Sequence, residues 1–433
     1  MKTAVIIGGN QSGLNMARCL ADVGFQVTLF EKKAQNEVAF DWTDDVDPTI
    51  FSTVGIPLPP ERTYFKKKDW TFVNPSETVK ITVHGGAQSE DISVYRRPLN
   101  DYLYGLACNK ATIKYRTEVN SLIVEGKKVV GVTVGEEKIF CDLVVDCSGA
   151  LSTFRASLPE ETMIQRMPDK TELFYAYRGF FKAKDGVKAP EMTNKAYLRH
   201  GKKEGISWCI YHEGTADVLI GRIGGITEEE ISDALNELKK DNPIIGEELV
   251  KAGFVSIIPV RYPISRMVAD GYVLCGDSAF MTIPMMGSGI ACSLDCGKML
   301  ADVLKRSDDC GVKNLWHYQV AFFKKYAAFT GVDLLKRWLL STAAENVDFL
   351  FESGVIDEEM LANGVGGEGV KMPFGVMMKK GWLGRKRLGV LLQVAGIMSK
   401  SDKANALARN IPEEFDDEEA VKWQNRIDGL FNR

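Results

Sequence analysis

Hydrophobic positions in the first 32 residues predict a strand, a helix and a second strand. An apolar run over residues 4–8 is typical of a buried strand, and a glycine-rich turn follows it. The second strand is expected over residues 26–30, and Glu31 closes it. This order is that of a βαβ unit, in which the turn and the helix N-terminus can face the pyrophosphate of a dinucleotide. Between the strands, apolar residues recur at helical spacing, at Leu14, Ala17, Leu20 and Ala21.

The turn of this unit carries an incomplete form of the dinucleotide fingerprint G-x-G-x-x-G. Gly8 makes the tight turn and Gly13 lets helix and strand pack closely, but Asn10 stands where the second glycine is expected. Asn10 either preserves the turn, because Asn tolerates a left-handed backbone better than most residues, or holds the phosphates less closely. A plain βαβ unit with a small-residue turn is the alternative. The expected nucleotide contacts, with the Glu31 carboxylate at the ribose hydroxyls, are Gly8, Asn10, Ser12, Gly13, Glu31 and Lys32.

Less regular patterns fill residues 33–145. Residues 33–78 predict a long connection with short helices, and the alternation of apolar residues over 79–83 predicts a strand. A helix is expected over residues 99–106, with Arg96 and Arg97 at its entrance. Three strands joined by glycine turns should follow, over 118–124, 129–134 and 138–145.

Strand-like patterns dominate residues 171–260 and predict a mostly antiparallel sheet, which we interpret as a second domain. One helix interrupts them, because Thr227 followed by Glu230 forms a capping box. Residues 271–304 return to strand, glycine turn and long helix, and from about residue 312 the pattern is mainly helical. The expected strands of the antiparallel sheet cover 172–182, 196–200, 206–211, 218–223 and 254–259.

Length and charge narrow the classes of function. At 433 residues the chain can bury a large core, in two or three domains, and its net charge of −4 argues against a dedicated nucleic-acid binder. No stretch of eighteen uncharged apolar residues occurs, so no membrane span is expected, and the immediate start of the first strand leaves no room for a signal peptide. The nine cysteines form no C-x-x-C pair, and the four histidines do not cluster. We expect a cytoplasmic protein with reduced thiols and no metal.

Three separated motifs occur in a characteristic order. The βαβ start with Glu31 comes first, DCSGALSTFR at residues 146–155 second, and Gly276-Asp277 with the glycine turn at 284–289 third. Together they resemble the FAD-binding folds of the p-hydroxybenzoate hydroxylase type, over about the first 330 residues. Within that group the chain is most similar to the geranylgeranyl reductase family, which includes FixC-like flavoproteins.

The resemblance implies roles for residues of the second and third motifs. A strand ending in Gly-Asp places Asp277 at a sheet edge, where it can accept a hydrogen bond from a ribityl hydroxyl. The turn before the next helix can direct backbone N–H groups toward the N1 and O2 side of a flavin, through Pro284, Gly287, Ser288 and Gly289. Ser148 replaces the aspartate that monooxygenases place before Gly149, which leaves direct binding of a pyridine nucleotide open.

Two further positions match residues that contact FAD in the family. Arg96 matches an arginine that opens a helix and contacts the cofactor, with Arg97 as the alternative and ordinary surface charge as the competing interpretation. Val119 matches a position whose backbone meets the adenine.

Residues 206–211, ISWCIY, resemble the aromatic-x-Trp-x-Phe-Pro segment beside the substrate cavity of geranylgeranyl reductases. They also resemble the Trp-x-Trp-x-Ile-Pro segment of flavin-dependent halogenases, although the catalytic lysine of halogenases has no convincing counterpart. Trp208 is kept in both comparisons, whereas Ile206 and Tyr211 depart from the pattern. We expect Trp208 either to line a substrate cavity or to belong to the core of a strand. Tyr211 and His212 are candidate proton donors by their proximity to Trp208.

The expected fold class is α/β, a Rossmann-like FAD-binding domain with an inserted antiparallel-sheet substrate domain and a helical C-terminal region. The FAD-binding domain is expected in three parts, over 1–65, 96–160 and 266–311. Strands of the substrate domain are expected over 66–95, the main body of its antiparallel sheet over 161–265, and the helical C-terminal region over 312–433.

The leading interpretation is an FAD-dependent oxidoreductase that reduces carbon–carbon double bonds of a hydrophobic substrate, with isoprenoids and other lipids as candidates. Hydride would come from N5 of the flavin. Two alternatives are a flavin-dependent monooxygenase or halogenase, and a degenerate flavoprotein fold retained for binding. The electron donor, NAD(P)H or a ferredoxin-type protein, stays open, as does a FixC-like transfer of electrons between soluble carriers.

Two segments near the C-terminus affect this interpretation. The second match to G-x-G-x-x-G, at residues 364–369, follows a helix-like run and no strand, so we expect one bound dinucleotide. Basic side chains alternate with apolar ones over residues 371–400. Such a segment either lies on an anionic membrane surface or forms a helix pair packed on its own domain, so peripheral membrane contact is an open expectation.

Overall fold

A computed structural model describes residues 1–84, 91–365 and 374–431. The βαβ start is built as predicted, and it forms the centre of a six-stranded sheet with strand order β18-β19-β12-β1-β2-β8. The strand β1 pairs in parallel with β2 and with β12, and its apolar side chains are buried. Only β18 runs antiparallel to its neighbour. The strands are β1 (Thr3–Ile7), β2 (Gln26–Phe30), β8 (Thr112–Lys114), β12 (Leu143–Asp146), β18 (Val268–Ala269) and β19 (Tyr272–Leu274).

Helices cover this parallel sheet and complete the larger hydrophobic core. The helix α1 (Gln11–Asp22) packs against α3 (Arg96–Ala107) and α6 (Ile290–Arg306), and α6 packs against α7 (Val312–Tyr326). Because parallel strands are buried on both faces, β1 and β12 are continuous apolar runs rather than alternating ones.

A seven-stranded sheet forms the second part of the molecule, with order β17-β13-β16-β15-β14-β5-β6. All its neighbouring strands are antiparallel except β14 and β5, which confirms the predicted mostly antiparallel sheet. The helix α5 (Glu228–Asp241) packs beside it and begins at the Thr227–Glu230 capping box. The strands are β5 (Trp70–Val73), β6 (Lys80–Val83), β13 (Leu173–Ala183), β14 (Asn194–Leu198), β15 (Gly205–His212), β16 (Thr215–Ile223) and β17 (Ile245–Pro259).

One predicted strand is wrong, because residues 138–145 form two strands in different sheets. The first, β11 (Glu137–Phe140), belongs to a small sheet of order β11-β10-β9, whereas β12 joins the parallel sheet. Asp142 lies between them and accepts a hydrogen bond from the backbone N–H of Thr3, at 2.8 Å. That bond ties the break in the chain to the start of β1. The other strands are β9 (Val119–Glu125), β10 (Lys128–Val134) and a third sheet of β3 (Thr43–Val46), β7 (Ile92–Tyr95) and β4 (Tyr64–Lys66).

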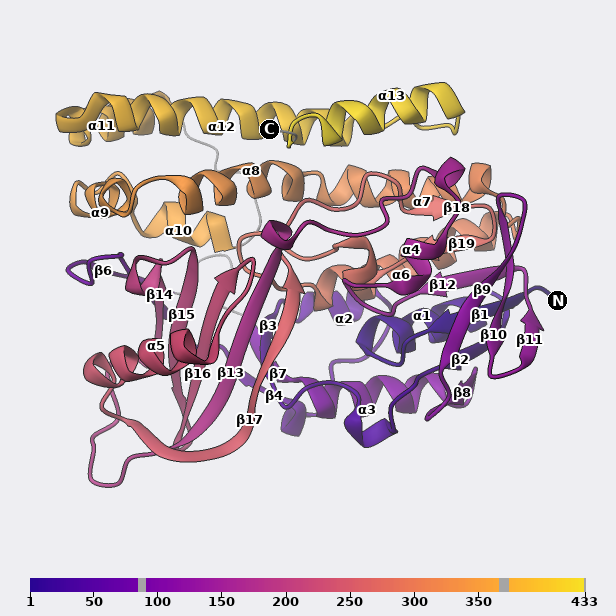
Figure 1. The fold of residues 1–433 in the computed structure, drawn as a ribbon, viewed down its shortest axis with the longest axis horizontal. Helices are drawn as coiled ribbons and strands as arrows, with labels where there is room; N and C mark the ends of the chain where they lie inside the picture. Colours follow the sequence, from indigo (N-terminus) through magenta and orange to yellow (C-terminus); the bar gives the residue numbers. More distant parts are fainter. Residues whose placement is uncertain (85–90, 366–373, 432–433) are drawn as a thin grey trace.

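The C-terminal region is helical, as predicted, and forms two rows of helices. Figure 1 shows α11, α12 and α13 in an outer row, with α7, α8 and α9 beneath them. No helix in the described part of the chain is both long and apolar enough to cross a membrane. The helices not yet named are α2 (Thr49–Thr53), α4 (Thr153–Ser157), α8 (Ala328–Ser341), α9 (Ala344–Glu352), α10 (Glu358–Val365), α11 (Phe374–Leu383), α12 (Leu388–Arg409) and α13 (Asp417–Asp428).

Candidate functional site

A polar cavity of about 660 Å³ lies where the carboxyl ends of β1, β2 and β12 meet. This edge of a doubly wound sheet is where such folds bind ligands. Of the predicted cofactor contacts, Gly13, Pro284 and Ser288 are not on its wall. Those that line it are Gly8, Asn10, Ser12, Glu31, Lys32, Arg96, Val119, Gly149, Asp277, Gly287 and Gly289.

The turn between β1 and α1 requires glycine at two positions. Gly8 has a φ of +107°, and a Cβ there would lie 2.6 Å from the carbonyl oxygen of Cys147. Its N–H donates to the carbonyl of Phe30, at 2.8 Å, which closes the turn onto β2. A Cβ on Gly13 would collide with the carbonyl oxygen of Gly8. Gly13 therefore allows the close approach of helix and strand and does not face the cavity.

Asn10 does not adopt the left-handed backbone, which was one of the two alternatives that the sequence left open for it. Its φ and ψ are −77° and −177°, which is extended, because Asn10 is the N-cap of α1. Its side-chain oxygen accepts from the N–H of Gly13 (3.1 Å) and the hydroxyl of Ser12 (2.5 Å), while its amide donates to the carbonyl of Cys147 (2.9 Å). The turn thus survives through side-chain hydrogen bonds and not through tolerance of a positive φ.

Glu31 lies at the end of β2 with its carboxylate turned back toward the turn. It accepts from the N–H of Gly9 at 2.7 Å and from that of Lys33 at 2.8 Å. A carboxylate has about four lone-pair sites, so both oxygens can still accept from the hydroxyls of a ribose. A carboxylate acceptor at the end of β2 fits the ribose in the adenosine part of a dinucleotide.

At the other end of the cavity, Arg96 forms a bidentate ion pair with Asp44, with one of the two contacts at 3.0 Å. Arg97 points outward instead and pairs with Asp41 at 3.2 Å. Burial raises the pKa of Asp277, an effect that Arg96 opposes and Asp44 reinforces. Asp277 is nevertheless open to the interior of the cavity, so a ligand hydroxyl can reach it.

The side chains of the second motif are used for internal hydrogen bonds. Asp146 is fully buried and accepts from Ser148, from Ser152 and, at 2.6 Å, from Tyr272. Arg155, also fully buried, donates to the carbonyl of Ala150 at 2.7 Å and to that of Ser278. These bonds hold the loop after β12 against the loop that carries Asp277. Gly149, which belongs to the loop after β12 and has a φ of +105°, lines the polar cavity.

A second, apolar cavity of about 310 Å³ adjoins the first. Gly287 and Ile258 line both cavities, so the two meet there. Pro284 and Ser288 line the apolar side of this junction. The walls of the apolar cavity come from one face of the seven-stranded sheet, including Phe174, Ala196, Ile206, Trp208, Ile210 and Leu219, and from the C-terminal helices, including Leu335, Leu339, Val347, Leu361, Val394 and Ile397.

Alternation along β15 separates Tyr211 from Trp208 and His212, which lie on the same face of the strand. Trp208 lines the apolar cavity, whereas Tyr211 points to the opposite face of the sheet and packs in the cluster beside α5. His212 stacks on Phe65, with ring centroids 3.9 Å apart, and lies 3.4 Å from the hydroxyl of Tyr95. Burial lowers the pKa of His212. Neither Tyr211 nor His212 is among the described residues that line the two cavities.

Two cavity residues could not be predicted from the sequence: Trp42 lies in the irregular segment 33–78, and Arg178 lies in a predicted strand whose pattern does not show that it faces a cavity. Trp42 lines the polar cavity, and within the described part of the chain its buried indole N–H has no hydrogen-bond partner. The guanidinium groups of Arg96 and Arg178 each lie 5.3 Å from its ring. Arg178 reaches the apolar cavity and is paired with Asp217 at 2.5 Å. An unpaired buried donor at a cavity wall fits a site built for a polar ligand.

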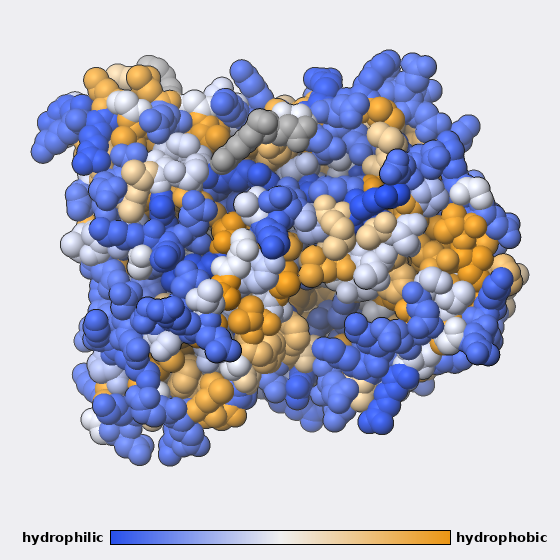
Figure 2. Space-filling model, viewed as in Figure 1, coloured by the Kyte–Doolittle hydropathy of each residue, from blue (hydrophilic) through white to orange (hydrophobic). Residues whose placement is uncertain are grey.

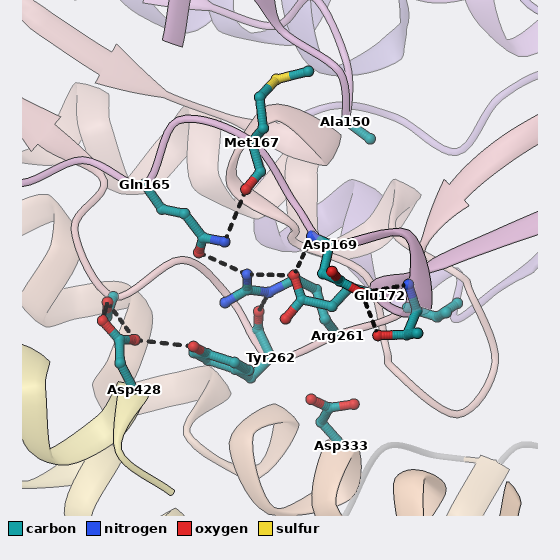
Figure 3. A network of polar contacts seen from close by, with 12 residues as sticks. Ala150, Gln165, Met167, Asp169, Glu172, Arg261, Tyr262, Asp333 and Asp428 are labelled. Carbon is teal, nitrogen blue, oxygen red and sulfur yellow. Dashed lines mark hydrogen bonds and ion pairs between the residues drawn. The ribbon is translucent and has the colours of Figure 1, made fainter. Parts of the chain in front are cut away.

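A buried polar network holds the end of β17, next to the junction, against the C-terminal helices. Arg261 is fully buried and donates to Glu172 at 3.1 Å and to Gln165 at 2.6 Å. The neighbouring Tyr262 donates to Asp428 of α13 at 3.0 Å. Figure 3 shows these side chains converging from three distant segments of the chain. The network fixes the residues that follow Ile258 and so steadies the wall that the two cavities share.

The described residues hold no group of three or more His, Cys, Asp or Glu arranged to bind a metal ion. Within the second match to G-x-G-x-x-G, residues 366–369 lie outside the described part of the chain. Residues 358–365 form α10, so a helix and not a strand comes before them, as the sequence indicated.

Comparison with known proteins agrees with this geometry. The family model described as FAD binding domain matches residues 1–308. The digeranylgeranylglycerophospholipid reductase of Sulfolobus acidocaldarius is 23% identical, over 99% of this chain and 96% of the relative. An enzyme of the same name from Methanopyrus kandleri is 23% identical, over 73% of this chain and 84% of the relative.

Among solved structures, a geranylgeranyl bacteriochlorophyll reductase-like protein from Thermoplasma acidophilum matches with a TM-score of 0.72 at 18% identity, over 92% of this chain and 100% of that one. A myxobacterial chondrochloren halogenase, an FAD-dependent enzyme, matches with a TM-score of 0.62 at 16% identity, over 99% and 97% of the two chains. At such identities these two likenesses show the fold alone. The chain belongs to the FAD binding domain family, and it is an FAD-dependent oxidoreductase related to the geranylgeranyl reductases.

Proposed function

We propose that the protein reduces carbon–carbon double bonds of a hydrophobic, isoprenoid-type substrate. The observation that carries this proposal is the junction of the two cavities at Gly287 and Ile258. One cavity has the polar groups that a dinucleotide needs, and the other has a predominantly aliphatic and aromatic wall with few polar side chains. A flexible apolar chain fits the second cavity, because binding there removes its surface from water. The names of the relatives from Sulfolobus and Methanopyrus, which denote reductases of a digeranylgeranyl lipid, support the same substrate class.

We assign FAD to the polar cavity, with Glu31 at the adenosine ribose, the N-terminus of α1 at the pyrophosphate and Val119 at the adenine. Asp277 would accept from the ribityl chain, and the backbone before α6 would face the flavin ring through Gly287 and Gly289. The remaining members of this proposed site are Gly8, Asn10, Ser12, Gly13, Lys32, Arg96, Gly149, Pro284 and Ser288. Reduced FAD would supply a hydride at N5.

The chain's own residues orient the substrate and supply the proton that must reach the second carbon. We place this proton step at Ser93 and Asp45, which both line the apolar cavity. The hydroxyl of Ser93 donates to the carboxylate of Asp45 at 2.6 Å, and Asp45 lies beside the junction, since its backbone carbonyl is 3.5 Å from the hydroxyl of Ser288. Tyr211 and His212 are less suited, because neither lines a cavity: Tyr211 faces the other side of the sheet, and His212 is stacked behind Phe65 of the cavity wall.

Trp208 has a different part in this proposal. Its indole group donates hydrogen bonds but does not release its proton at ordinary pH, so we assign it to the cavity wall. There it would pack against the apolar chain of the substrate and keep water from the reacting carbons.

The proposal is tested by single-turnover reduction without air. The FAD-loaded protein is reduced with dithionite, which avoids any choice of physiological donor, and a prenyl alcohol of four isoprene units is added. The flavin absorbance should return, and mass spectrometry should find a product heavier by two hydrogens per reduced bond. Ser93→Ala should slow this step by about tenfold to a thousandfold, the range of a lost acid–base contribution, whereas Ser76→Ala on the surface should not.

Oxygen separates this proposal from the other flavin chemistries. If reduced enzyme stays reduced with the prenyl alcohol but turns over when air is admitted, and the product gains oxygen or halogen, a monooxygenase or halogenase is favoured instead. Failure to reduce any prenyl substrate while FAD remains bound would reject the proposed reaction.

A further inference from the structure

The outer face of α11 and α12 carries a row of large apolar side chains that face solvent. Met378 and Trp382, four residues apart on α11, are 61% and 64% exposed, and Leu388 and Leu392, four apart on α12, are 62% and 73% exposed. Residues four apart lie on the same side of a helix. The short 3₁₀ turn η7 (Arg385–Arg387) joins the two helices, and we call the solvent-facing side of this helix pair, which carries the four residues, the outer C-terminal surface.

The charged residues of the segment that carries this surface, 375–400, are all of one sign. Residues 375–400 contain six basic residues and no acidic one, while the whole chain has a net charge of −4, which leaves −10 for all other residues together. Lys380 is buried and paired with Asp357 at 2.6 Å. The other five basic residues are exposed: Lys379, Arg385, Lys386, Arg387 and Lys400. Figure 2 shows hydrophobic and strongly hydrophilic side chains intermixed at the upper left edge, over α11.

The arrangement of Arg385 and Trp382 suits an interface between water and lipid. The guanidinium group of Arg385 lies 3.8 Å from the centre of the indole ring of Trp382, and it donates to the carbonyl of Trp382 at 2.7 Å. Tryptophan prefers the headgroup level of a bilayer, and arginine beside it can reach lipid phosphates. An exposed apolar row rimmed by positive charge is complementary to an anionic lipid surface and not to water alone.

The opposite side of α12 lines the apolar cavity. Val394, Ile397 and Met398 line the apolar cavity, together with Met360 and Leu361 of α10. The same helix therefore presents apolar side chains outward at Leu392 and inward at Val394 and Ile397. The helix that would rest on the bilayer is therefore also part of the wall against which a bound lipid chain would pack.

We propose that the outer C-terminal surface docks the protein on an anionic lipid bilayer, with α11 and α12 lying along the headgroup region. This inference rests on the proposed function for its purpose, the collection of an isoprenoid lipid, but its evidence is the surface itself. It commits to lipid as the partner, because a segment with no acidic residue over 375–400 and an exposed Trp–Arg pair matches anionic headgroups in charge and in chemistry.

The test is co-sedimentation of the FAD-loaded protein with vesicles. Vesicles of phosphatidylcholine with one quarter phosphatidylglycerol should pellet the protein at low ionic strength, and pure phosphatidylcholine vesicles should pellet much less. Lys379→Glu with Lys386→Glu should weaken the binding to anionic vesicles by about thirtyfold or more, since each basic residue near such a surface contributes a factor of about five and the new carboxylates are repelled in addition. Among the residues that the structure describes, neither lysine has a hydrogen-bond or ion-pair partner that the change would remove, so folding should be kept.

Matched controls come from the other end of the molecule. Lys127→Glu with Lys138→Glu makes the same change in net charge on exposed positions of the β9–β11 sheet, and it should leave vesicle binding within about twofold of the unchanged protein. Trp382→Ser should weaken binding about tenfold, whereas Phe140→Ser, at a position 61% exposed on β11, should not. Equal losses in the control variants would show that net charge alone acts, and would overturn the proposal.

Two other results would also overturn it. No binding to anionic vesicles is the first. The second is concentration-dependent dimerisation in sedimentation velocity, abolished by Trp382→Ser, with no vesicle binding, which would assign this surface to a second copy of the chain. Vesicle binding needs no turnover, so the two proposals fail separately. If the protein binds vesicles but reduces no prenyl alcohol, the docking proposal stands and the proposed reaction is rejected. If it reduces a short soluble prenyl alcohol but binds no vesicles, the proposed reaction stands and the docking proposal is rejected.

Discussion

At the scale of single residues, the FAD site depends on side chains that satisfy backbone groups of the turn between β1 and α1. Asn10 caps α1 through the N–H of Gly13 and bridges to the carbonyl of Cys147. Its backbone is extended, so a glycine at this position would gain no freedom that the turn needs. Where the fingerprint has a glycine, this chain therefore holds the turn with the side-chain hydrogen bonds of Asn10.

Asn10→Gly tests this interpretation. The variant restores the G-x-G-x-x-G pattern but loses the cap and the bridge to Cys147, so the free energy of unfolding should fall by about 1 kcal/mol. FAD affinity should stay the same or weaken. Urea unfolding and fluorescence titration of the apoprotein with FAD measure the two quantities. Tighter FAD binding in the variant would mean that the Asn10 side chain obstructs the phosphates.

Glu31→Gln tests the carboxylate at the end of β2. Loss of its charge weakens the hydrogen bonds that it accepts, both from the turn and from the ribose, so the dissociation constant for FAD should rise by about tenfold. The control is Glu37→Gln, since Glu37 also accepts a backbone N–H, that of Ala34 at 3.0 Å, but is exposed outside the cavity. An equal change in both variants would place the effect in the local fold and not in FAD binding.

At the scale of elements, the short 3₁₀ turn η5 (His200–Lys202), between β14 and β15, carries a buried histidine that makes stability depend on pH. His200 is buried and hydrogen-bonded through Nδ1 to Ser207 of β15, at 3.0 Å. The carboxylates of Glu237 and Glu77 lie 3.6 and 3.9 Å from Nε2 and favour the charged ring. Burial, aided by the charge of Arg222, outweighs them and lowers the pKa of His200 to about 4.

The sign of the pH effect follows from that lowered pKa. Between pH 6.5 and 4 the unfolded chain binds a proton at His200 that the folded chain does not, so stability falls as the pH falls. Between pH 7.5 and 5 this residue alone should cost about 2 kcal/mol. The measurement is urea unfolding at both pH values, for the unchanged protein and for His200→Gln, which cannot titrate. If the two proteins lose the same stability, His200 does not titrate in this range.

Elements with a clear period were predictable from the sequence, and elements set by distant contacts were not. The βαβ start, the antiparallel sheet and the capped helix α5 follow local patterns, and the structure confirms them. The division of residues 138–145 into β11 and β12 depends on Asp142 reaching Thr3, which no local pattern shows. Trp42 and Asp45 belong to the irregular segment 33–78 and reach the cavities only through the packing of the whole chain. The domain boundaries and the roles of the individual site residues stay predictions.

At the scale of the whole molecule, the C-terminal helices give an FAD-binding fold one wall of an apolar cavity. The sequence indicated that this region is helical, but not that α8, α9, α10 and α12 supply one wall of the cavity opposite the seven-stranded sheet. In the proposed function, the junction at Gly287 sets where the reacting double bond lies. The wall at α12 then sets how much apolar chain fits beyond it.

Ile397→Trp tests this division of the cavity. Ile397 lines the wall at α12 and has no part in the junction. The larger side chain should shorten the cavity and lower kcat/KM by about tenfold or more for a prenyl alcohol of four isoprene units, because one misfitting group in an apolar pocket has an effect of that size. For an alcohol of two isoprene units, kcat/KM should stay within about twofold, since the short chain does not reach α12.

Gln393→Trp, on the exposed side of the same helix, controls for any disturbance of α12 itself. Equal losses for both alcohols would mean that the chain lies elsewhere in the cavity, whereas a loss confined to the long alcohol would show that the substrate extends from the flavin toward the helices that we propose rest on the membrane.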